Sequence, residues 1–474
     1  MRCRSVSLSC KGKINHLIRL PFPHKSGGAS VYGAVAWVRY SKIIAPVSVW
    51  CNWFAWSPVL AIGSGLAAGY ILGALFPADA AINTWQLTLV DLGFIKSGLE
   101  LRINATFLVG VVLLLAVFGI QHGGILRSAR TTMVLGITAL IPLMLIALVP
   151  LLSGDMPSTH FSPMVPIAWE NGLVVDGSWN MAGVTLMAGG LFIAAWSTYG
   201  FETAVCYTRE FKDPKKDTFK AILFSGLLCI VVFTLVPLAF QGHLGLGEVV
   251  TPPVVEADGT VSSPAVYSGM LAPDVYSGMG VASVMSHMVG GGEVVANVLS
   301  IMTSMAGSSR TLYQASVDGW LPRYLSHVNE HGAPTRAMWT DLGSNLILLM
   351  LSDYVFVLAC SNVGYIIFNF LNLNSGWIHR IDRPDWERPF KAPNIILGIG
   401  VVLAFVNLAL MGLGADIYGA GTLTAGLVFA SLIIPVFLYR HYVQDKGQFP
   451  DAMIEDMHLN DQLPSGGKRA GMLP

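Results

Sequence analysis

The sequence is short of charge. Only 12% of its 474 residues are Asp, Glu, Lys or Arg, about half of the roughly 25% that is usual in soluble globular domains. By contrast, 53% of the residues are hydrophobic, and the mean hydropathy is +0.60. Apolar runs near or above the length of about 18 residues that can cross a bilayer recur along the chain. The composition excludes a soluble globular protein and predicts an all-α polytopic membrane protein.

Several other signatures are missing. The cysteines form no CxxC pair, and the chain contains no HExxH metal motif and no GxSxG nucleophile motif. The stretches between apolar runs are too short to bury an independent core. The start of the chain has no apolar signal-peptide core, which leaves a basic cytoplasmic segment or an organelle transit peptide. We expect no enzyme activity, no metal site, no cofactor and no nucleic-acid partner.

Ten apolar segments are long enough to be predicted as membrane spans. Their positions divide the chain so that nearly all basic residues fall on one side of the membrane. With the N-terminus in the cytoplasm, all Lys and Arg residues except Lys96 and Arg102 fall on inner segments. By the positive-inside rule, both termini are expected in the cytoplasm and the chain in the cell membrane. The expected spans are 43–76, 105–121, 131–152, 184–206, 221–241, 280–308, 337–352, 354–377, 395–414 and 418–439.

Three regions follow from this pattern. Residues 1–42 are expected to form a basic cytoplasmic segment and loop, and residues 43–444 a transmembrane domain. Residues 445–474 are polar and predict a disordered cytoplasmic tail. Within the spans, prolines such as Pro58 remove a backbone hydrogen bond and predict kinks.

The stretch WSTYGFETA, residues 196–204, places polar groups inside an apolar run. Gly200 weakens a helix by about 1 kcal/mol relative to alanine, and Glu202 is costly in lipid unless it faces the protein interior. We predict that the helix breaks near Gly200 and that the freed backbone groups line a site for a polar ligand. The alternative is that Gly200 is a packing notch and Glu202 snorkels to the surface or stays protonated against a neighbouring helix.

Four stretches in order resemble the amino acid–polyamine–organocation (APC) permeases. WSTYGFETA and the basic loop after it resemble the sixth helix of that family and its following loop, although Asp213 stands where the family usually has Asn. The other three are PHKSGGASVYGAVAW (23–37), SSRTLYQASVDGWLPRYLSHVNEHGAPTRA (308–337) and DRPDWERPFKAP (382–393).

This resemblance implies a leucine-transporter-like fold of two inverted repeats, with a site between broken helices one and six. It implies a secondary active transporter, a symporter or exchanger, that moves amino acids or related amines by alternating access. Glu202 would couple occupancy of the site to helix movement, with a proton or sodium ion as the possible coupling ion. The implied substrate-binding residues are Trp196, Ser197, Thr198, Tyr199, Gly200, Phe201, Trp56 and Ser57.

The resemblance also implies a departure from the family pattern. If 23–37 is the loop after helix two, then 43–76 corresponds to helix three and the ten spans to helices 3–12. The chain is then expected to lack helices one and two, and with them the wall opposite Gly200. Either the sequence is an incomplete copy of a twelve-helix permease, or it is a truncated, non-transporting membrane protein that binds or scaffolds a partner. The amino acid, the coupling ion and the oligomeric state stay open.

Overall fold

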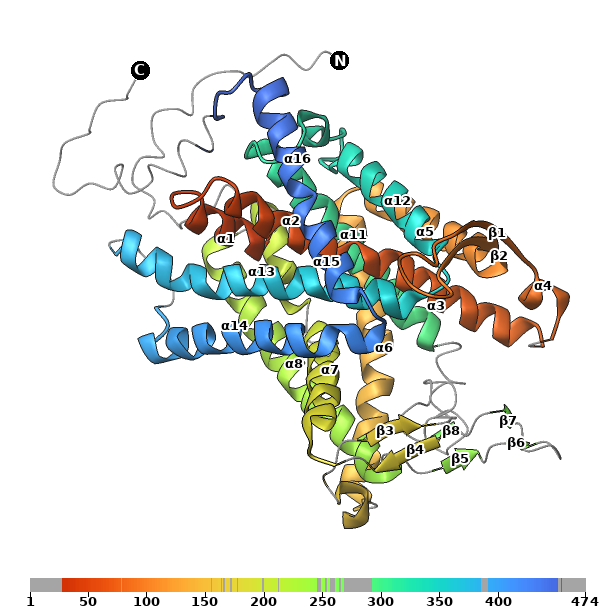
Figure 1. Ribbon diagram of the computed structural model, residues 1–474. Helices are drawn as coiled ribbons and strands as arrows, with labels where there is room; N and C mark the ends of the chain where they lie inside the picture. The colour runs from red at the N-terminus through yellow and green to blue at the C-terminus, as the bar shows by residue number, and fades with distance from the viewer. Residues whose placement is uncertain are drawn as a thin grey trace.

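The structure is a computed structural model, and Figure 1 shows its course. It describes residues 28–450 and Met453, apart from 78, 155, 163, 165–166, 171–172, 177, 198–199, 212, 245–248, 252–253, 256–260, 264–265, 268–291, 385–390 and 451–452. The N-terminal segment 1–27 and the end of the expected tail therefore lie outside the described residues.

Helices dominate the described chain. In order, the α-helices are α1 (Ala29–Trp37), α2 (Ile44–Trp56), α3 (Pro58–Leu75), α4 (Ala81–Thr84), α5 (Ala105–His122), α6 (Ile125–Ser153), α7 (Met181–Ser197), α8 (Pro214–Leu244), α11 (Gly292–Val317), α12 (Thr335–Leu349), α13 (Tyr354–Asp382), α14 (Asn394–Gly414), α15 (Thr422–Ser431) and α16 (Ile433–Leu438). Shorter helical segments are η1 (Ser158–Phe161), η2 (Phe201–Glu210), η4 (Arg323–Ser326), η5 (Ala415–Tyr418) and η6 (Tyr439–Gln444).

The expected outer loops contain short antiparallel hairpins. The strands are β1 (Gln86–Asp91), β2 (Glu100–Asn104), β3 (Ile167–Glu170), β4 (Leu173–Asp176), β5 (Val249–Thr251), β6 (Val254–Val255), β7 (Val261–Ser263) and β8 (Val266–Tyr267). They pair as β1–β2, β3–β4, β5–β8 and β6–β7. The structure differs from the sequence prediction at the start of the chain. The segment up to residue 42 was expected to include a loop, and it contains helix α1.

The predicted all-α polytopic membrane fold is confirmed. Within the described residues, seven helices are long and apolar enough to cross a membrane, judged by length and composition. The other three expected spans are also helical: 184–206 is α7 followed by η2, 280–308 enters α11 after residues outside the described part, and 337–352 is α12. The first of these three spans is broken in the middle.

The predicted kink lies at Pro58, at the junction of α2 and α3 within one 32-residue helical span. α2 ends at Trp56 and Pro58 is the first residue of α3, where a missing backbone N–H and a fixed φ do least harm. The side chain of Asn345 on α12 accepts a 3.1 Å hydrogen bond from the Ala61 backbone N–H in the first turn of α3. An amide from a distant helix therefore satisfies a donor at the start of this helix.

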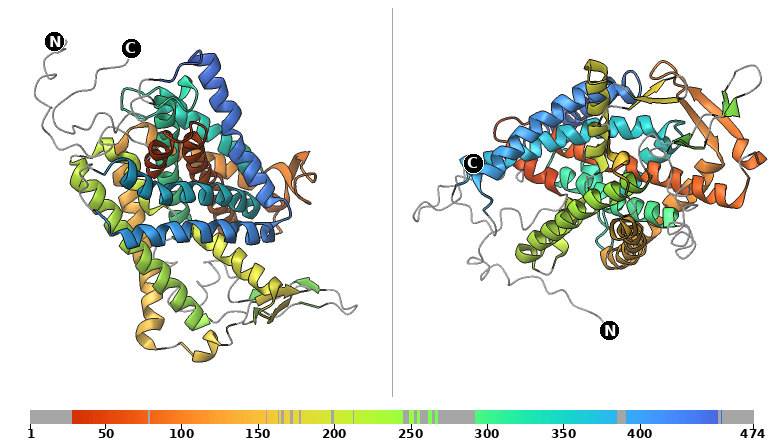
Figure 2. Two further views of the ribbon diagram at one scale, coloured as in Figure 1. Left: turned by 60° about the vertical axis from the view of Figure 1, so that its left-hand side comes forward. Right: turned by 90° about the horizontal axis from the view of Figure 1, so that it is seen from below.

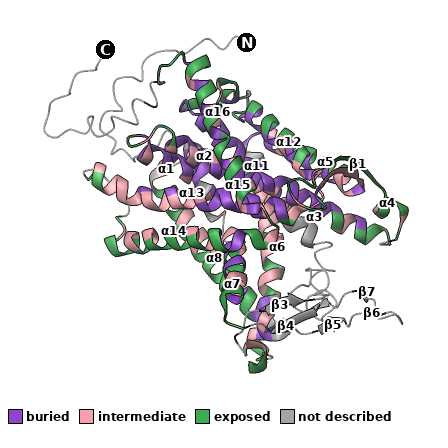
Figure 3. Cartoon of the chain, in the orientation of Figure 1, coloured by how far each residue is buried: buried purple, intermediate pink, exposed green. Residues whose placement is uncertain are grey.

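Burial follows the packing of these helices. Figure 3 shows buried residues gathered on α2, α11 and α13, whereas α14 and α8 are largely exposed. The exposed side chains on α8 and α14 include large apolar ones, such as Phe224, Ile230 and Ile395. Contiguous exposed apolar surface of this kind suits contact with lipid. In Figures 1 and 2, α6 and α8 extend steeply away from the layer that α13 and α14 form.

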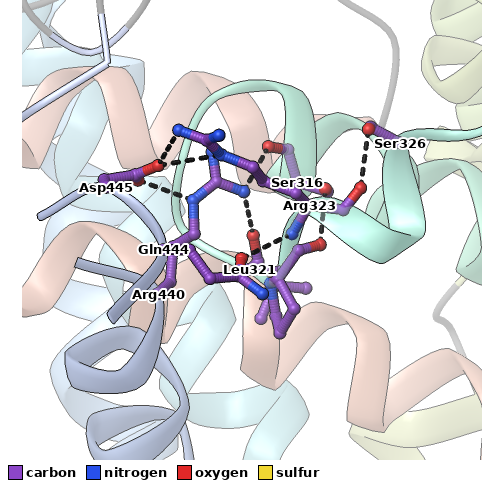
Figure 4. Close-up of polar contacts among 8 residues, drawn as sticks. Ser316, Leu321, Arg323, Ser326, Arg440, Gln444 and Asp445 are labelled. Carbon is purple, nitrogen blue, oxygen red and sulfur yellow. Dashed lines mark hydrogen bonds and ion pairs between the residues drawn. The ribbon is translucent and has the colours of Figure 1, made fainter. Parts of the chain in front are cut away.

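The first residues of the expected disordered tail are folded against the protein, which corrects that prediction for 445–450. Asp445 is buried and accepts a 2.6 Å bond from Nε of the buried Arg440, and Arg323 of η4 donates 2.8 and 3.1 Å bonds to the other carboxylate oxygen. Arg440 also donates to the carbonyl of Leu321 at 2.6 Å and to that of Ser316 (Figure 4). The pairing offsets part of the cost of burying these charges, and removing one partner would leave a buried charge uncompensated.

A second ion pair holds the β1–β2 hairpin to the rest of the molecule. Lys96, in the turn of the hairpin, pairs with Asp353 just before α13 and donates a 3.1 Å bond to the carbonyl of Tyr418. Asp353 also accepts a 2.9 Å bond from the Phe356 backbone N–H as the N-cap of α13. Partial burial raises the pKa of Asp353, but the bonds from Lys96 and Phe356 outweigh it and hold the pKa below its ordinary value.

This ion pair predicts a pH-dependent stability. The folded pKa of Asp353 is lowered, so its contribution is present above the unfolded value of about 3.9 and is lost as the pH falls through the lower folded value. Asp353→Asn keeps the helix cap but removes the charge. We expect a lower melting temperature than wild type at pH 7 and a difference that shrinks as the pH falls below about 4 and disappears below the folded pKa, measured by thermal unfolding in detergent.

Glu100→Gln is the matched control, because the Glu100 carboxylate lies in the same hairpin and accepts a bond from the Thr88 hydroxyl rather than from a cation. It should change the melting temperature little at either pH. A gap between Asp353→Asn and wild type that persists at low pH would show that the charge of Asp353 is not what stabilises the hairpin.

Candidate functional site

The predicted break at Gly200 is present. α7 ends at Ser197, η2 begins at Phe201, and Gly200 between them has φ of 119° and ψ of −17°. This is a positive-φ conformation that L-residues with a side chain rarely adopt. A glycine therefore permits an interruption of the helix in the middle of an apolar segment.

The backbone of Gly200 is hydrogen-bonded by the second and third residues after it, Glu202 and Thr203. The carboxylate of Glu202 accepts a 3.3 Å bond from the Gly200 backbone N–H. The Thr203 hydroxyl and backbone N–H donate to the Gly200 carbonyl at 2.6 and 3.0 Å. Glu202 therefore does not snorkel away from the break: it bonds the backbone of the residue at which the helix is interrupted.

Two polar groups near the break lack a partner. The indole Nε1 of Trp196, in the last turn of α7, is buried without a hydrogen-bond partner among the described residues. One turn earlier, the Phe192 carbonyl accepts a 2.5 Å bond from the amide nitrogen of the buried Asn362 on α13. The amide oxygen of Asn362 has no partner in the described part of the chain. An unpaired buried donor or acceptor costs about 1–3 kcal/mol, so a ligand that pairs with either group would recover that cost.

Trp56 lies on the other side of the break. It is 4% exposed at the end of α2, and a Cβ atom placed on Gly200 would lie 3.6 Å from its ring. A Cβ atom on Gly307 of α11 would lie 3.7 Å from the same ring and 3.5 Å from the Thr203 methyl group. The structure thus brings Trp56, Gly200 and Thr203 together, with Gly307 as a small residue that the sequence did not single out.

Ser57 directly follows Trp56 in the chain, but its side chain lies in a polar cluster away from Gly200. Its hydroxyl donates a 2.6 Å bond to the carboxylate of Asp341 on α12 and accepts a 2.8 Å bond from the Asn345 amide. Neither Asp341 nor Asn345 was recognised from the sequence. The signal was available, because a carboxylate inside the expected span 337–352 is expensive in lipid and usually has a function.

A model of the amino acid permease family matches residues 21–437. The chain belongs to this family. The chain that contains the break at Gly200 is therefore a member of a family of transport proteins rather than enzymes, as the absence of catalytic motifs predicted.

Individual relatives agree with this assignment. The branched-chain amino acid permease BcaP of Bacillus subtilis is 24% identical over 48% of this chain and 46% of its own length. The polyamine transporter PUT1 of Oryza sativa is 25% identical over 76% of this chain and 61% of its own. Solute carrier family 7 member 13 of Mus musculus is 25% identical over 44% and 40%. The chain spans about half the length of the curated relatives it matches.

The remaining members of the predicted permease site can be placed only in part. Thr198 and Tyr199 lie outside the described residues. Ser197 is the last residue of α7 and Phe201 the first of η2, and neither side chain is described. Their binding roles stay predictions. Among the residues that the structure describes, no group of three or more His, Cys, Asp or Glu side chains is arranged to hold a metal ion.

The backbone at Gly200 predicts that alanine will be tolerated sterically but not conformationally. The nearest contact of the new Cβ would be an ordinary 3.6 Å, yet the positive φ should cost about 1–2 kcal/mol. We expect Gly200→Ala to lower the melting temperature of the purified chain in detergent.

Gly307→Ala is the control for this prediction. Its Cβ would also meet ordinary contacts, at 3.5 Å and beyond, but Gly307 lies inside α11, where alanine favours the helix by up to about 1 kcal/mol. Equal melting temperatures for Gly200→Ala and wild type would show that the break does not depend on a glycine.

Proposed function

We propose that this chain is part of a secondary active transporter that binds an amino acid at the break between α7 and η2 and moves it by alternating access. The interrupted helix is the observation that carries the proposal, because a helix break in lipid persists only where its backbone groups are buried in protein or line a cavity. Membership of the amino acid permease family supports transport as the purpose of that break.

The two partnerless groups favour an amino acid over a polyamine. An indole N–H can only donate and so suits a carboxylate, whereas an amide oxygen accepts and suits an ammonium group. Trp196 and Asn362 provide one of each, around the same end of α7. A polyamine offers ammonium groups but no carboxylate. The names of the relatives include both substrate classes, and the indole donor favours the first.

We further propose that Glu202 couples binding to movement. Its carboxylate holds the Gly200 backbone N–H, so protonation of Glu202, or competition by the substrate for that N–H, would loosen the break. The coupling ion in this proposal is a proton. The distribution of Lys and Arg residues supports a cell-membrane protein with both termini in the cytoplasm, which reporter fusions at each end would test.

Binding of the amino acid should depend on the Trp196 indole N–H. Trp196→Phe removes this donor and keeps an aromatic ring. We expect the affinity of the chain, reconstituted in lipid nanodiscs, for amino acids to fall about tenfold, since one hydrogen bond to a charged group is worth about 1.5 kcal/mol or more. Isothermal titration calorimetry with a panel of amino acids and polyamines would measure it.

Trp320→Phe is the matched control. The Trp320 indole N–H is also buried without a partner in the described chain, but it lies in the loop after α11, next to Leu321, which Arg440 contacts. Its replacement should leave amino acid affinity unchanged. Equal affinities for Trp196→Phe and wild type would remove Trp196 from the site. Tighter binding of polyamines than of amino acids would overturn the substrate class.

Glu202→Gln should separate binding from coupling. The amide oxygen can still accept the bond from the Gly200 N–H, whereas the side chain can no longer exchange a proton. We expect amino acid binding to persist and uptake into proteoliposomes to lose its dependence on a pH gradient. Gradient-driven uptake that equals wild type would exclude Glu202 as the coupling residue.

The alternative of a scaffold protein without transport finds no support in the family match or among the relatives. It predicts a different outcome: no amino acid would bind the reconstituted chain, while a protein partner would copurify with it in fixed stoichiometry. The calorimetric titration of the wild-type chain distinguishes the two proposals.

A further inference from the structure

A single carboxylate lies at the centre of the contact between α3, α11 and α12. Asp341 is completely buried. One of its oxygens accepts a 2.9 Å bond from the Trp53 indole N–H and a 2.6 Å bond from the Ser57 hydroxyl. The other accepts a bond from the Ser308 hydroxyl on α11. The three donors come from the end of α2, the junction with α3 and the middle of α11.

Among the described residues, no cation forms an ion pair with this carboxylate. All of the hydrogen-bond partners that Asp341 has in the described chain are neutral. An uncompensated buried charge costs several kcal/mol, and ionisable residues inside membrane proteins usually mark ion or proton pathways. The titratable and charged residues with described side chains on α12 and on the elements around it are Cys51 of α2, Tyr70 of α3, His122 of α5, Arg310 and Tyr313 of α11, Asp318 just after α11, Arg323 and Tyr324 of η4, and Arg336 of α12.

The kinked helix nevertheless makes the ionised form possible. Ser57 is the N-cap of α3, and the Asn345 amide, which bonds the Ser57 hydroxyl, also accepts the Ala61 N–H in the first turn. Asp341 therefore lies at the proline kink of this span, where its oxygens accept hydrogen bonds from side chains on both sides of the kink.

The cluster can also hold the protonated form. A carboxylate only accepts hydrogen bonds, whereas a carboxylic acid donates one. If Asp341 took up a proton on the oxygen next to Ser308, its O–H could donate to the Ser308 hydroxyl oxygen. The Ser308 hydroxyl could then turn to the Met305 carbonyl, which lies at 3.4 Å. Both protonation states would keep every hydrogen bond of the carboxyl group.

We propose that Asp341 is a proton-binding site within the membrane-embedded helices, formed with Ser57 and Ser308 at the kink between α2 and α3. It is separate from Glu202 and from the residues at Gly200. Its use as a second coupling site beside Glu202 rests on the proposed function, but its occupancy by a proton does not.

A row of buried polar groups links this site towards α1. Thr311 follows Ser308 by one turn on α11 and accepts a 3.4 Å bond from the Asn52 amide on α2. The same amide donates a 3.0 Å bond to the Ser30 hydroxyl of α1, and the Ser30 carbonyl accepts the Ser48 hydroxyl at 3.2 Å. All of these side chains are at most 2% exposed. With α1 on the cytoplasmic side, as the charge distribution predicts, these buried polar side chains extend from that side to α11.

Infrared difference spectroscopy tests the site without any substrate. The reconstituted full chain in nanodiscs is taken through a pH titration, and the carbonyl stretch of protonated carboxyl groups is recorded. We expect this absorption band to titrate with pH in wild type and one titrating component of it to be missing in Asp341→Asn, while the components of other carboxyl groups, Glu202 among them, remain. Asp213→Asn is the control, because Asp213 is a half-exposed carboxylate before α8, and this variant should keep the Asp341 component.

Ser308→Ala provides an independent test in case Asp341→Asn does not fold. Loss of the hydroxyl that donates to the carboxylate should move the midpoint of the Asp341 component to higher pH by about one unit. A band unchanged in both variants would overturn the proposal. A band that does not respond to pH but changes when sodium is added would also overturn it and would assign a sodium site. A chain that shows the band but does not bind amino acids would refute the transport proposal and leave the proton site intact.

Discussion

Every part of this structure depends on one constraint: a backbone N–H or C=O inside lipid must find its partner within the protein. Two apolar spans depart from a regular helix, by a proline kink at Ser57–Pro58 and by a break at Gly200, and each departure frees backbone groups that a regular helix would pair. The structure supplies partners in both places. Asn345 on α12 pairs the first turn of α3, whereas Glu202 and Thr203 pair the backbone of Gly200 from the residues that follow it.

The kink and the break differ in what completes them. The kink at Pro58 is satisfied by a distant helix, so it fixes α3 against α12 and brings Asp341 to the same point. The break at Gly200 is satisfied locally, and among the described residues near it the indole Nε1 of Trp196 and the amide oxygen of Asn362 are left without partners. This division suits a transporter, since the kink belongs to a fixed scaffold and the break can change its hydrogen bonds when a ligand enters.

Much of this arrangement was predictable, because it follows from local chemistry. Proline lacks an N–H and glycine permits a positive φ, so Pro58 and Gly200 mark their own helix ends. The length and apolarity of each span likewise follow from the thickness of the bilayer. The position of Trp196 in the last turn of α7 then follows from its distance in sequence from Gly200.

What could not be predicted depends on contacts between distant parts of the chain. Ser57 meets Asp341 across a separation of 284 residues, and Lys96 meets Asp353 across 257. No local pattern shows that Ser57 turns towards α12 while its neighbour Trp56 faces Gly200. The start of the tail was misjudged for the same reason: Asp445 looks like part of a polar, disordered segment until Arg323 and Arg440 are placed beside it.

The most direct test of the central claim is hydrogen–deuterium exchange of the reconstituted chain, with and without a bound amino acid, followed at the peptide that covers residues 196–204. If the broken helix is the binding site, the amides on either side of Gly200 should gain protection when the amino acid is present, while those of α14 stay unchanged. Saturating amino acid binding that leaves this peptide unaltered would contradict the account.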